Sequence, residues 1–233
     1  MATELEVHPI QANILLVLLF KPNSRFKELN TTNVSSDHFN FHVRRLEQLD
    51  LIEKTDKGFY KLTPKGKEFA NRFDTDSVIL EKQAKVSALV SCTKKIKGKR
   101  YFLMQKRLKE PYFGFLGKIT GKVRWGETIY DAAERELKEE TGLSGKPKLA
   151  GVEHKTDIDK QGKLLEDKFF FVFKVENPKG NLKKIINGGE NIWMTREEVL
   201  KSGNKFKDLV DIFNIVSSKQ LKYVEKKYRE KSY

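Results

Sequence analysis

The sequence predicts an α/β domain preceded by a smaller, mainly helical module. Strand-like runs alternate with helical segments after residue 85, as is typical of α/β domains. Before residue 74, apolar residues recur mostly at helical spacing. The length of 233 residues exceeds that of a usual single domain. We therefore predict a module at residues 1–76, a linker at 77–84, and a larger domain at 85–233 that ends in helices.

The first module is predicted to hold three helices, a β-hairpin and a closing helix. The helices are expected at about 10–20, 25–30 and 36–50, and Ser35 and Ser36 are candidate N-caps for the third. Two short apolar runs flank Asp56-Lys57-Gly58, which is a turn signal. Pro64 lies near the first turn of the closing helix, where proline is tolerated.

The larger domain is predicted to combine strands with a long acidic helix. Strand-like runs occupy residues 85–92, 100–107, 148–154 and 167–176. The helix is expected at 127–141, because good helix formers fill it and Gly142 follows as a left-handed cap. Two more helices are expected at 195–202 and 205–228. The last is amphipathic and basic, which indicates a cap on the sheet or a homodimer contact.

Composition excludes a membrane-spanning or disulfide-stabilised protein. The longest apolar run, residues 14–20, is too short to cross a bilayer. The single cysteine, Cys92, cannot form an internal disulfide, so we expect a cytoplasmic protein. The net charge is +14, yet the first 76 residues hold as many acidic as basic side chains. The basic excess beyond them suits a polyphosphate or nucleic-acid partner, and a solvated lysine-rich surface is the alternative.

Three glutamates on the acidic helix occupy electrostatically unfavourable positions. Glu136, Glu139 and Glu140 share one helix face at i, i+3 and i+4. Two of them lie in the last turn beside the negative end of the helix dipole, and like charges at this spacing repel. A bound cation would explain the cluster. Because the ligands are all oxygen, we expect Mg²⁺ or Mn²⁺.

The spacing around this helix fits the pattern G-x5-E-x7-R-E-U-x-E-E-x-G-U, where U is aliphatic. The fixed positions are Gly121, Glu127, Arg135, Glu136, Leu137, Glu139, Glu140, Gly142 and Leu143. A chance match in a chain of this length is on the order of one in ten million. The stretch resembles the motif of the Nudix hydrolases. That resemblance implies an α/β/α sandwich with a mixed sheet, and hydrolysis of a diphosphate bond in a nucleoside diphosphate derivative.

The Nudix resemblance also implies roles for individual residues. The expected metal ligands are Glu136, Glu139, Glu140 and the carbonyl of Thr120, and the expected catalytic residues are Glu136, Glu139, Arg135 and Glu190. The expected substrate-binding residues are Arg124, Trp125 and Lys118. Two departures concern the loop before the helix. The segment "KITGK" stands where many members have P-G-G, and Arg124 replaces a frequent glutamate.

The order of elements in the first module resembles the winged helix-turn-helix domain of bacterial transcription regulators. The segment "RRLEQLDLIEKTDKGFYKLTPKG" carries the resemblance. In that family the third helix enters the DNA major groove and the hairpin touches the backbone or the minor groove. The implied DNA contacts are Ser36, His38, Asn40, Arg44, Arg45, Lys54 and Lys57. The balanced charge of the module favours the alternative, a protein-contact module.

Two functions follow from these resemblances. The first is a Mg²⁺-dependent hydrolase of a nucleotide diphosphate-type substrate, tethered to a module that binds double-stranded DNA. The second is a transcriptional regulator whose Nudix domain senses a nucleotide without turnover. The intact glutamate set favours the enzyme, because a pure sensor would tolerate its loss.

Overall fold

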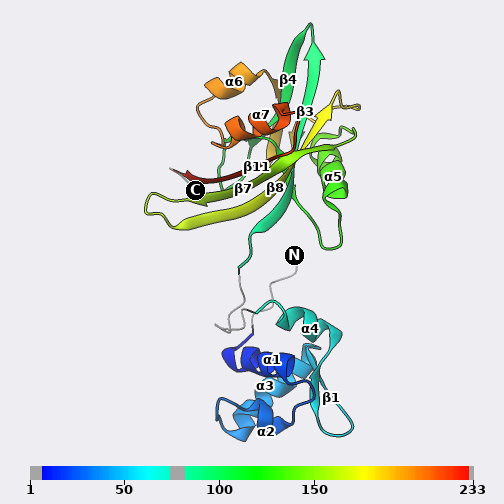
Figure 1. The fold of residues 1–233 in the computed structure, drawn as a ribbon, viewed down its shortest axis with the longest axis vertical. Helices are drawn as coiled ribbons and strands as arrows, with labels where there is room; N and C mark the ends of the chain where they lie inside the picture. Colours follow the sequence, from blue (N-terminus) through cyan, green and yellow to red (C-terminus); the bar gives the residue numbers. More distant parts are fainter. Residues whose placement is uncertain (1–6, 74–81, 231–233) are drawn as a thin grey trace. The chain divides into compact units, whose positions relative to one another are not determined.

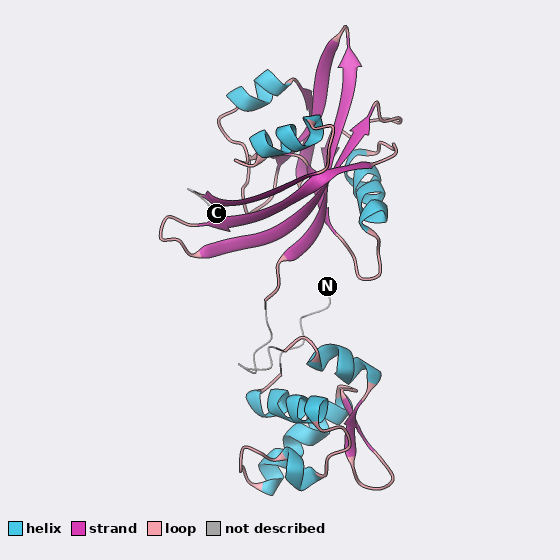
Figure 2. Ribbon diagram, viewed as in Figure 1, coloured by secondary structure: helices cyan, strands magenta, loops and turns pink. Residues whose placement is uncertain are grey.

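The computed structural model describes residues 7–73 and 82–230, which form two compact units divided between Lys82 and Gln83. Figures 1 and 2 show one unit built largely of helices and one built around a large sheet. Of the predicted linker at 77–84, residues 77–81 lie outside the described residues.

Helices surround a small hairpin in the first unit. In chain order its elements are α1 (Pro9–Phe20), α2 (Phe26–Leu29), α3 (Ser36–Gln48), β1 (Ile52–Lys54), β2 (Tyr60–Leu62) and α4 (Pro64–Ala70). Side chains cap the longer helices, because the first amides of a helix lack partners within it. Ser35 accepts a hydrogen bond from the His38 amide at the start of α3, and Thr63 accepts one from the Gly66 amide of α4.

Helical spacing places the core of this unit between α1 and α3. Phe39, Val43 and Leu46 lie on one face of α3 and are buried, as expected for residues three and four apart. They pack in one cluster with α1, whose apolar run is too short to cross a bilayer and is buried or half-buried here up to Leu19. Gly66 lets α4 approach the chain closely, because a Cβ there would lie 1.7 Å from the Leu51 carbonyl oxygen.

The second unit is built on one mixed sheet. Its strands are β3 (Lys85–Ile96), β4 (Lys99–Arg107), β5 (Leu116–Gly117), β6 (Ile119–Lys122), β7 (Lys148–Ile158), β8 (Leu164–Glu176), β9 (Ile185–Ile186), β10 (Gly189–Met194) and β11 (Lys222–Arg229). The described strands follow the order β11-β7-β8-β3-β4-β10-β9, with β5 beside β4 and β6 beside β3. β3 runs parallel to β8 and antiparallel to β4 and β6.

Helices cover both faces of this sheet. α5 (Ile129–Thr141) lies on one face, and α6 (Arg196–Lys201) and α7 (Leu209–Ser217) lie on the other (Figure 1). Because successive strand residues point to opposite faces, β3 sends Ala88, Val90 and Cys92 toward α5 and Leu89 toward α7. The predicted mixed sheet is confirmed.

The prediction of a helix over 205–228 holds only for residues 209–217 and is wrong elsewhere. α7 ends at Ser217, and Lys222–Arg229 form β11, which pairs in parallel with β7. Spacing in "LKYVEKKY" suits a helix, but the edge of β7 offers unpaired backbone groups, and this tertiary pairing overrides local propensity. Gly151 allows the close approach, since a Cβ there would lie 2.2 Å from the Lys222 carbonyl oxygen.

None of the helices in the described ranges combines the length and the apolar character that a membrane crossing requires.

Candidate active site

Helix α5 carries most of the predicted site. It begins at Ile129 rather than at Glu127, because Thr128 adopts an extended backbone and accepts a hydrogen bond from the Asp131 amide as N-cap. Glu127 therefore precedes the helix, a correction to the predicted start. Gly142 ends the helix with φ of 73°, the left-handed cap expected from the sequence.

Arg135 joins the glutamates into one network. Its guanidinium donates two hydrogen bonds to Glu127, at 2.6 Å to Oε1 and 2.9 Å to Oε2. It also donates to Glu136 Oε1 and, at 3.2 Å, to Glu139 Oε2. A further bond to the Lys122 carbonyl ties the helix to β6. The hydrogen bonds from Arg135, together with one from the Arg124 amide, lower the pKa of Glu127 to about 2, because they favour the charged carboxylate.

Glu136 is the most enclosed of the three clustered glutamates. It is 9% exposed, and a Cβ at position 121 would lie 1.7 Å from its Cδ. Gly121 belongs to strand β6 rather than to the predicted loop, and its missing side chain is the space that the Glu136 carboxylate fills. Burial raises the pKa of Glu136 above its ordinary value, and Glu140 and Glu139 add to the rise while Arg135 opposes it.

The other two glutamates have different neighbours. Glu139 is half exposed and contacts Arg124 and Arg135. Glu140 Oε2 accepts a hydrogen bond of 3.0 Å from Gln105 of β4, and its backbone carbonyl accepts one of 2.7 Å from buried Asn191 of β10. The end of α5 is therefore anchored to the two strands that carry Gln105 and Asn191.

Two predicted residues lie on strands beside this helix. Thr120 is on β6, opposite Leu89 of β3. Glu190 is on β10, opposite Lys106 of β4, and next in sequence to Asn191. The hydrogen bonds that join Glu127, Arg135, Glu136 and Glu139 do not include Glu190 among the described residues.

The donor set has the chemistry that a hard cation requires. All three side chains are carboxylates, and Arg135 already holds two of them within one cluster. No group of three or more His, Cys, Asp or Glu side chains in residues 7–73 and 82–230 is arranged to hold a metal ion. Glu139 forms ion pairs with Arg124 and Arg135. To bind a metal ion, the Glu139 carboxylate would have to give up these ion pairs.

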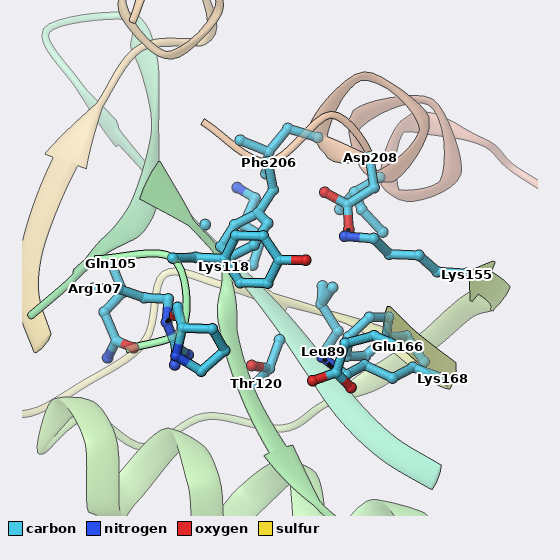
Figure 3. A pocket seen from close by; sticks show the side chains of 16 residues that line it. Leu89, Gln105, Arg107, Lys118, Thr120, Lys155, Glu166, Lys168, Phe206 and Asp208 are labelled. Atoms are coloured by element: carbon cyan, nitrogen blue, oxygen red, sulfur yellow. Dashed lines mark hydrogen bonds and ion pairs between the residues drawn. The ribbon is translucent and has the colours of Figure 1, made fainter. Parts of the chain in front are cut away.

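A pocket lies on the opposite side of the sheet from α5, under α7 (Figure 3). Its volume is about 140 Å³. Its lining includes Thr120 and Gln105, and Gln105 connects it to the glutamate cluster through its hydrogen bond to Glu140. Apolar walls come from Leu89, Phe170, Phe206, Leu209 and Ile212, and charged or polar ones from Arg107, Tyr112, Lys118, Lys155, Glu166, Lys168 and Asp208.

The predicted substrate-binding residues are not brought together. Lys118 is buried in the wall of the pocket, and none of the residues that the structure describes places a hydrogen-bond acceptor within reach of its Nζ. Trp125 is 95% exposed, and Arg124 pairs with Glu139. Both residues precede the first turn of α5, and neither lines the pocket. Tyr112, one of several aromatic residues in this region, is buried in the pocket.

The residues predicted to contact DNA occupy α3 and the hairpin. Asn40, Arg44 and Arg45 line a shallow hollow on α3 together with Asp37, Phe41 and Gln48. Ser36 lies in the first turn, and His38 Nε2 is 3.2 Å from His42 Nε2. Lys54 ends β1 and Lys57 lies in the turn, and both are exposed.

Sequence patterns gave no signal for several residues of the site. Gln105 and Asn191 support Glu140 from strands far away in sequence, and Phe206 and Asp208 enter the pocket from the segment before α7. The one available clue to Asn191 was its position next to Glu190.

Comparison with known proteins identifies the family of the chain. Residues 82–211 match the family described as NUDIX domain, so the chain belongs to the Nudix family, as the motif predicted. An ADP-ribose pyrophosphatase of Methanocaldococcus jannaschii is 39% identical over 82 residues, which cover 35% of this chain and 46% of that protein. The chain thus matches about half the length of this curated relative.

Solved structures share the fold of the second unit. A MutT protein from Bacillus halodurans superimposes with a TM-score of 0.52 and 25% identity, over 62% of this chain and 90% of that one. The Nudix domain of NrtR from Shewanella oneidensis, solved with ADP ribose, gives a TM-score of 0.52 at 14% identity, over 64% and 95% of the two chains. The second of these shows a likeness of fold alone.

Proposed function

We propose that this protein is a divalent-metal-dependent Nudix hydrolase that cleaves the diphosphate bond of a nucleoside diphosphate derivative. The observation that carries the proposal is the cluster of Glu136, Glu139 and Glu140, in which Arg135 holds Glu136 and Glu139 and Gln105, which also lines the pocket, holds Glu140. Membership of the Nudix family and the likeness to an ADP-ribose pyrophosphatase support it.

The proposed metal ligands are Glu136, Glu139, Glu140 and the carbonyl of Thr120. Mg²⁺ or Mn²⁺ held there would neutralise phosphate charge and lower the pKa of a bound water. Glu136 is proposed as the base at this position, because Arg135 and the space beside Gly121 hold its carboxylate in one place. Arg135 orients Glu136 and Glu139, and Glu190 is proposed as a further base from β10.

Basic side chains near the glutamate cluster suit an anionic diphosphate substrate. Arg124 is 3.4 Å from Glu139, so a cation already lies at the cluster, and Lys118 and Trp125 are proposed as further substrate contacts. Positioning and electrostatics supply most of the catalysis in phosphoryl transfer.

The proposal is tested by hydrolysis of a panel of nucleoside diphosphate derivatives, ADP-ribose among them, with Mg²⁺ or Mn²⁺. Glu139→Gln and Glu140→Gln are expected to lower kcat by orders of magnitude while the protein stays folded. Glu134→Gln is the matched control, since Glu134 is exposed on the same helix and lies outside the cluster. Full activity in excess EDTA would refute the metal requirement.

A second candidate function is favoured by the surface of α3. Arg44 and Arg45 are exposed beside Asn40 on the helix that the winged helix-turn-helix family inserts into DNA. A winged-helix DNA-binding module in the first unit, with contacts from Ser36, His38, Asn40, Arg44, Arg45, Lys54 and Lys57, would make the protein a tethered hydrolase or a nucleotide-sensing regulator.

Selection of duplexes from a random pool by the whole protein tests this second function. If Arg44 contacts a base, Arg44→Ala is expected to weaken binding by about 1–3 kcal/mol, mainly to duplexes that carry the preferred base at that position of the site. If Arg44 contacts a phosphate, the variant is expected to bind all duplexes more weakly and to show a smaller dependence of affinity on salt concentration. Lys27→Ala, an exposed charge loss on α2, is the control. If no sequence is enriched and Arg44→Ala changes nothing, the first unit is a protein-contact module.

A further inference from the structure

The hairpin that joins β3 and β4 continues past the strands on either side of it. Its outer residue pairs are Lys94–Tyr101, Lys95–Arg100 and Ile96–Lys99. β8 pairs with β3 no further than Thr93, and β10 pairs with β4 no further than Phe102. Within the described residues, positions 94–101 therefore form a two-stranded ribbon without flanking strands, here called the β3–β4 ribbon. Its tip stands clear of α5 and α6 in Figure 1.

The β3–β4 ribbon carries basic side chains and no acidic one. The basic residues are Lys94, Lys95, Lys97, Lys99 and Arg100. Lys94 Nζ lies 4.2 Å from the centroid of the Trp193 ring, and Lys99 acts electrostatically on Glu197 of α6. The other three are exposed, and none of the ion pairs formed within residues 7–73 and 82–230 involves them. Their charges are therefore available to an anionic partner.

Two of these cations face each other across the ribbon. Lys95 and Arg100 are register partners, so their side chains lie on the same face, with Cβ atoms about 5 Å apart. Like charges placed directly opposite destabilise an antiparallel pair. A polyanion beside the two cations would remove this repulsion. The placement is therefore unfavourable in the free protein and favourable in a complex with a polyanion.

A tight turn fixes Lys97 at the tip of the ribbon. Lys97 and Gly98 both have positive φ, of 47° and 78°, as in a two-residue type I′ turn. The twist of this turn matches that of the two strands it joins. The three cations are therefore presented in a fixed register on paired backbone rather than on a long loop.

The shape and place of the ribbon favour duplex DNA among polyanions. Arg100 precedes Gln105, the residue that bonds to Glu140, by five positions of β4, which is about 17 Å at the rise of a strand. A diphosphate held at the glutamate cluster therefore does not reach the ribbon. The major groove of B-DNA, about 12 Å wide, admits a two-stranded β-ribbon between walls of phosphates. The major groove of duplex RNA is too narrow for side chains to read.

We propose that the β3–β4 ribbon binds duplex DNA, lies in its major groove and contacts the phosphates through Lys95, Lys97 and Arg100. The interaction uses neither the glutamate cluster nor the first unit, so it is independent of the proposed hydrolysis and of the proposed contacts of α3. Because the contacts are with phosphates, binding is expected to depend little on base sequence and to weaken as the salt concentration rises.

Fluorescence anisotropy of the full chain with a short random-sequence DNA duplex, at a series of salt concentrations, tests the inference. The ribbon variant combines Lys95→Gln, Lys97→Asn and Arg100→Gln, because asparagine tolerates the left-handed backbone of position 97. It is expected to reduce the slope of log K against log salt by about 2.7 if all three cations contact phosphates, and by at least about 0.9. The control variant removes the same charge from exposed lysines elsewhere in the second unit, at Lys160, Lys163 and Lys219, and is expected to change the slope much less.

The fold of the ribbon variant is checked by its thermal midpoint, which should not fall, because the substitutions remove the repulsion between positions 95 and 100. Lys97→Asn alone, at the exposed tip, gives a second measurement with an expected slope change of about 0.9. The effect should persist in an Arg44→Ala background, which removes a candidate contact of the first unit. Equal slopes in the ribbon and control variants, or no binding of wild-type protein to DNA at low salt, overturn the inference. An RNA duplex that binds as tightly and is equally sensitive to the ribbon variant overturns the placement in the major groove.

Discussion

Lys118 and Lys155 line the same pocket, but their amines have opposite surroundings. Burial lowers the pKa of Lys118 to about 7. Burial also acts against the charge of Lys155, but Asp208 and Asp157 outweigh it and raise its pKa. The same residue type is therefore a destabilising charge at one position and half of a buried ion pair at the other.

Lys118→Met is expected to raise the thermal midpoint. Since the pKa of Lys118 is lower in the folded chain, the folded state binds fewer protons between about pH 7 and 10.5, and stability rises with pH in that window. The gain from Lys118→Met should be largest below pH 7, on the order of a few kcal/mol, and should vanish near pH 10.5. Lys155→Met is the control and is expected to destabilise, because it leaves buried Asp157 and Asp208 without their cation. Equal effects of the two variants would contradict this account.

The contribution of Glu153 to stability has the opposite dependence on pH from that of Lys118. Burial, with the charge of Asp208, raises its pKa to about 8. The Tyr228 hydroxyl is 2.8 Å from Asp211 and 3.2 Å from Glu153. Because that hydroxyl donates only one proton, a protonated Glu153 that donates to Tyr228 satisfies both contacts.

Glu153→Gln tests this assignment by thermal melts at several pH values. The folded state holds an extra proton between about pH 4.5 and 8, so the wild-type protein loses stability as pH rises through that window. The glutamine variant does not titrate, so its stability relative to the wild type should increase between about pH 4.5 and 8. Above pH 8 the difference in stability should stay constant. A difference that is flat from pH 4 to 9 would show that Glu153 titrates normally.

At the scale of elements, the contact between β6 and α5 positions the metal-ligand candidates. Strand β6 pairs with β3 over Ser87–Val90, which fixes Thr120 and Gly121 beside the helix. The Glu136 carboxylate of α5 lies against Gly121 of the strand, where the lack of a side chain leaves space for it.

Gly121→Ala is expected to lower kcat/KM by at least about tenfold and to leave the fold intact. The new methyl group would lie within 1.9 Å of the present Glu136 Oε1, so the carboxylate must move, although a side-chain end can move more readily than backbone. Gly203→Ala serves as the control, since a Cβ there meets nothing within 4 Å. Unchanged kinetics in Gly121→Ala would show that the position of Glu136 does not limit the reaction.

On the scale of the whole molecule, two separate cores imply two responses to metal. The first unit holds its own apolar cluster, and the three candidate carboxylates all belong to the second. A ligand that binds only the native state stabilises by about 2.7 kcal/mol at a hundredfold excess over its Kd.

Mg²⁺ or Mn²⁺ is expected to raise the thermal midpoint of the second unit and to leave that of the first unchanged in the full chain. Calorimetry resolves this if the units melt separately, and hydrogen exchange in α3 and α5 reports it if they do not. Substituting glutamine at Glu136, Glu139 and Glu140 together should abolish the shift. An identical shift in that triple variant would place the ion elsewhere.

Local patterns in the sequence determined the parts of this protein that depend on neighbours along the chain. The caps at Ser35 and Gly142, the buried face of α3 and the clustering of Glu136, Glu139 and Glu140 all follow from spacings of four residues or fewer. The motif also identified the family, because its fixed positions reflect one helix and the strand before it.

Contacts between distant segments were decided only by the tertiary structure. β11 is a strand because the edge of β7 was open to it, although its own residues suit a helix. Gln105 and Asn191 reach Glu140 from strands 35 and 51 residues away. Lys118 was predicted as a substrate contact, and the packing of Phe102 and Phe213 around it buries its amine away from any hydrogen-bond acceptor of the described residues. Sequence spacing encodes neighbours along one element, whereas burial depends on which elements pack together.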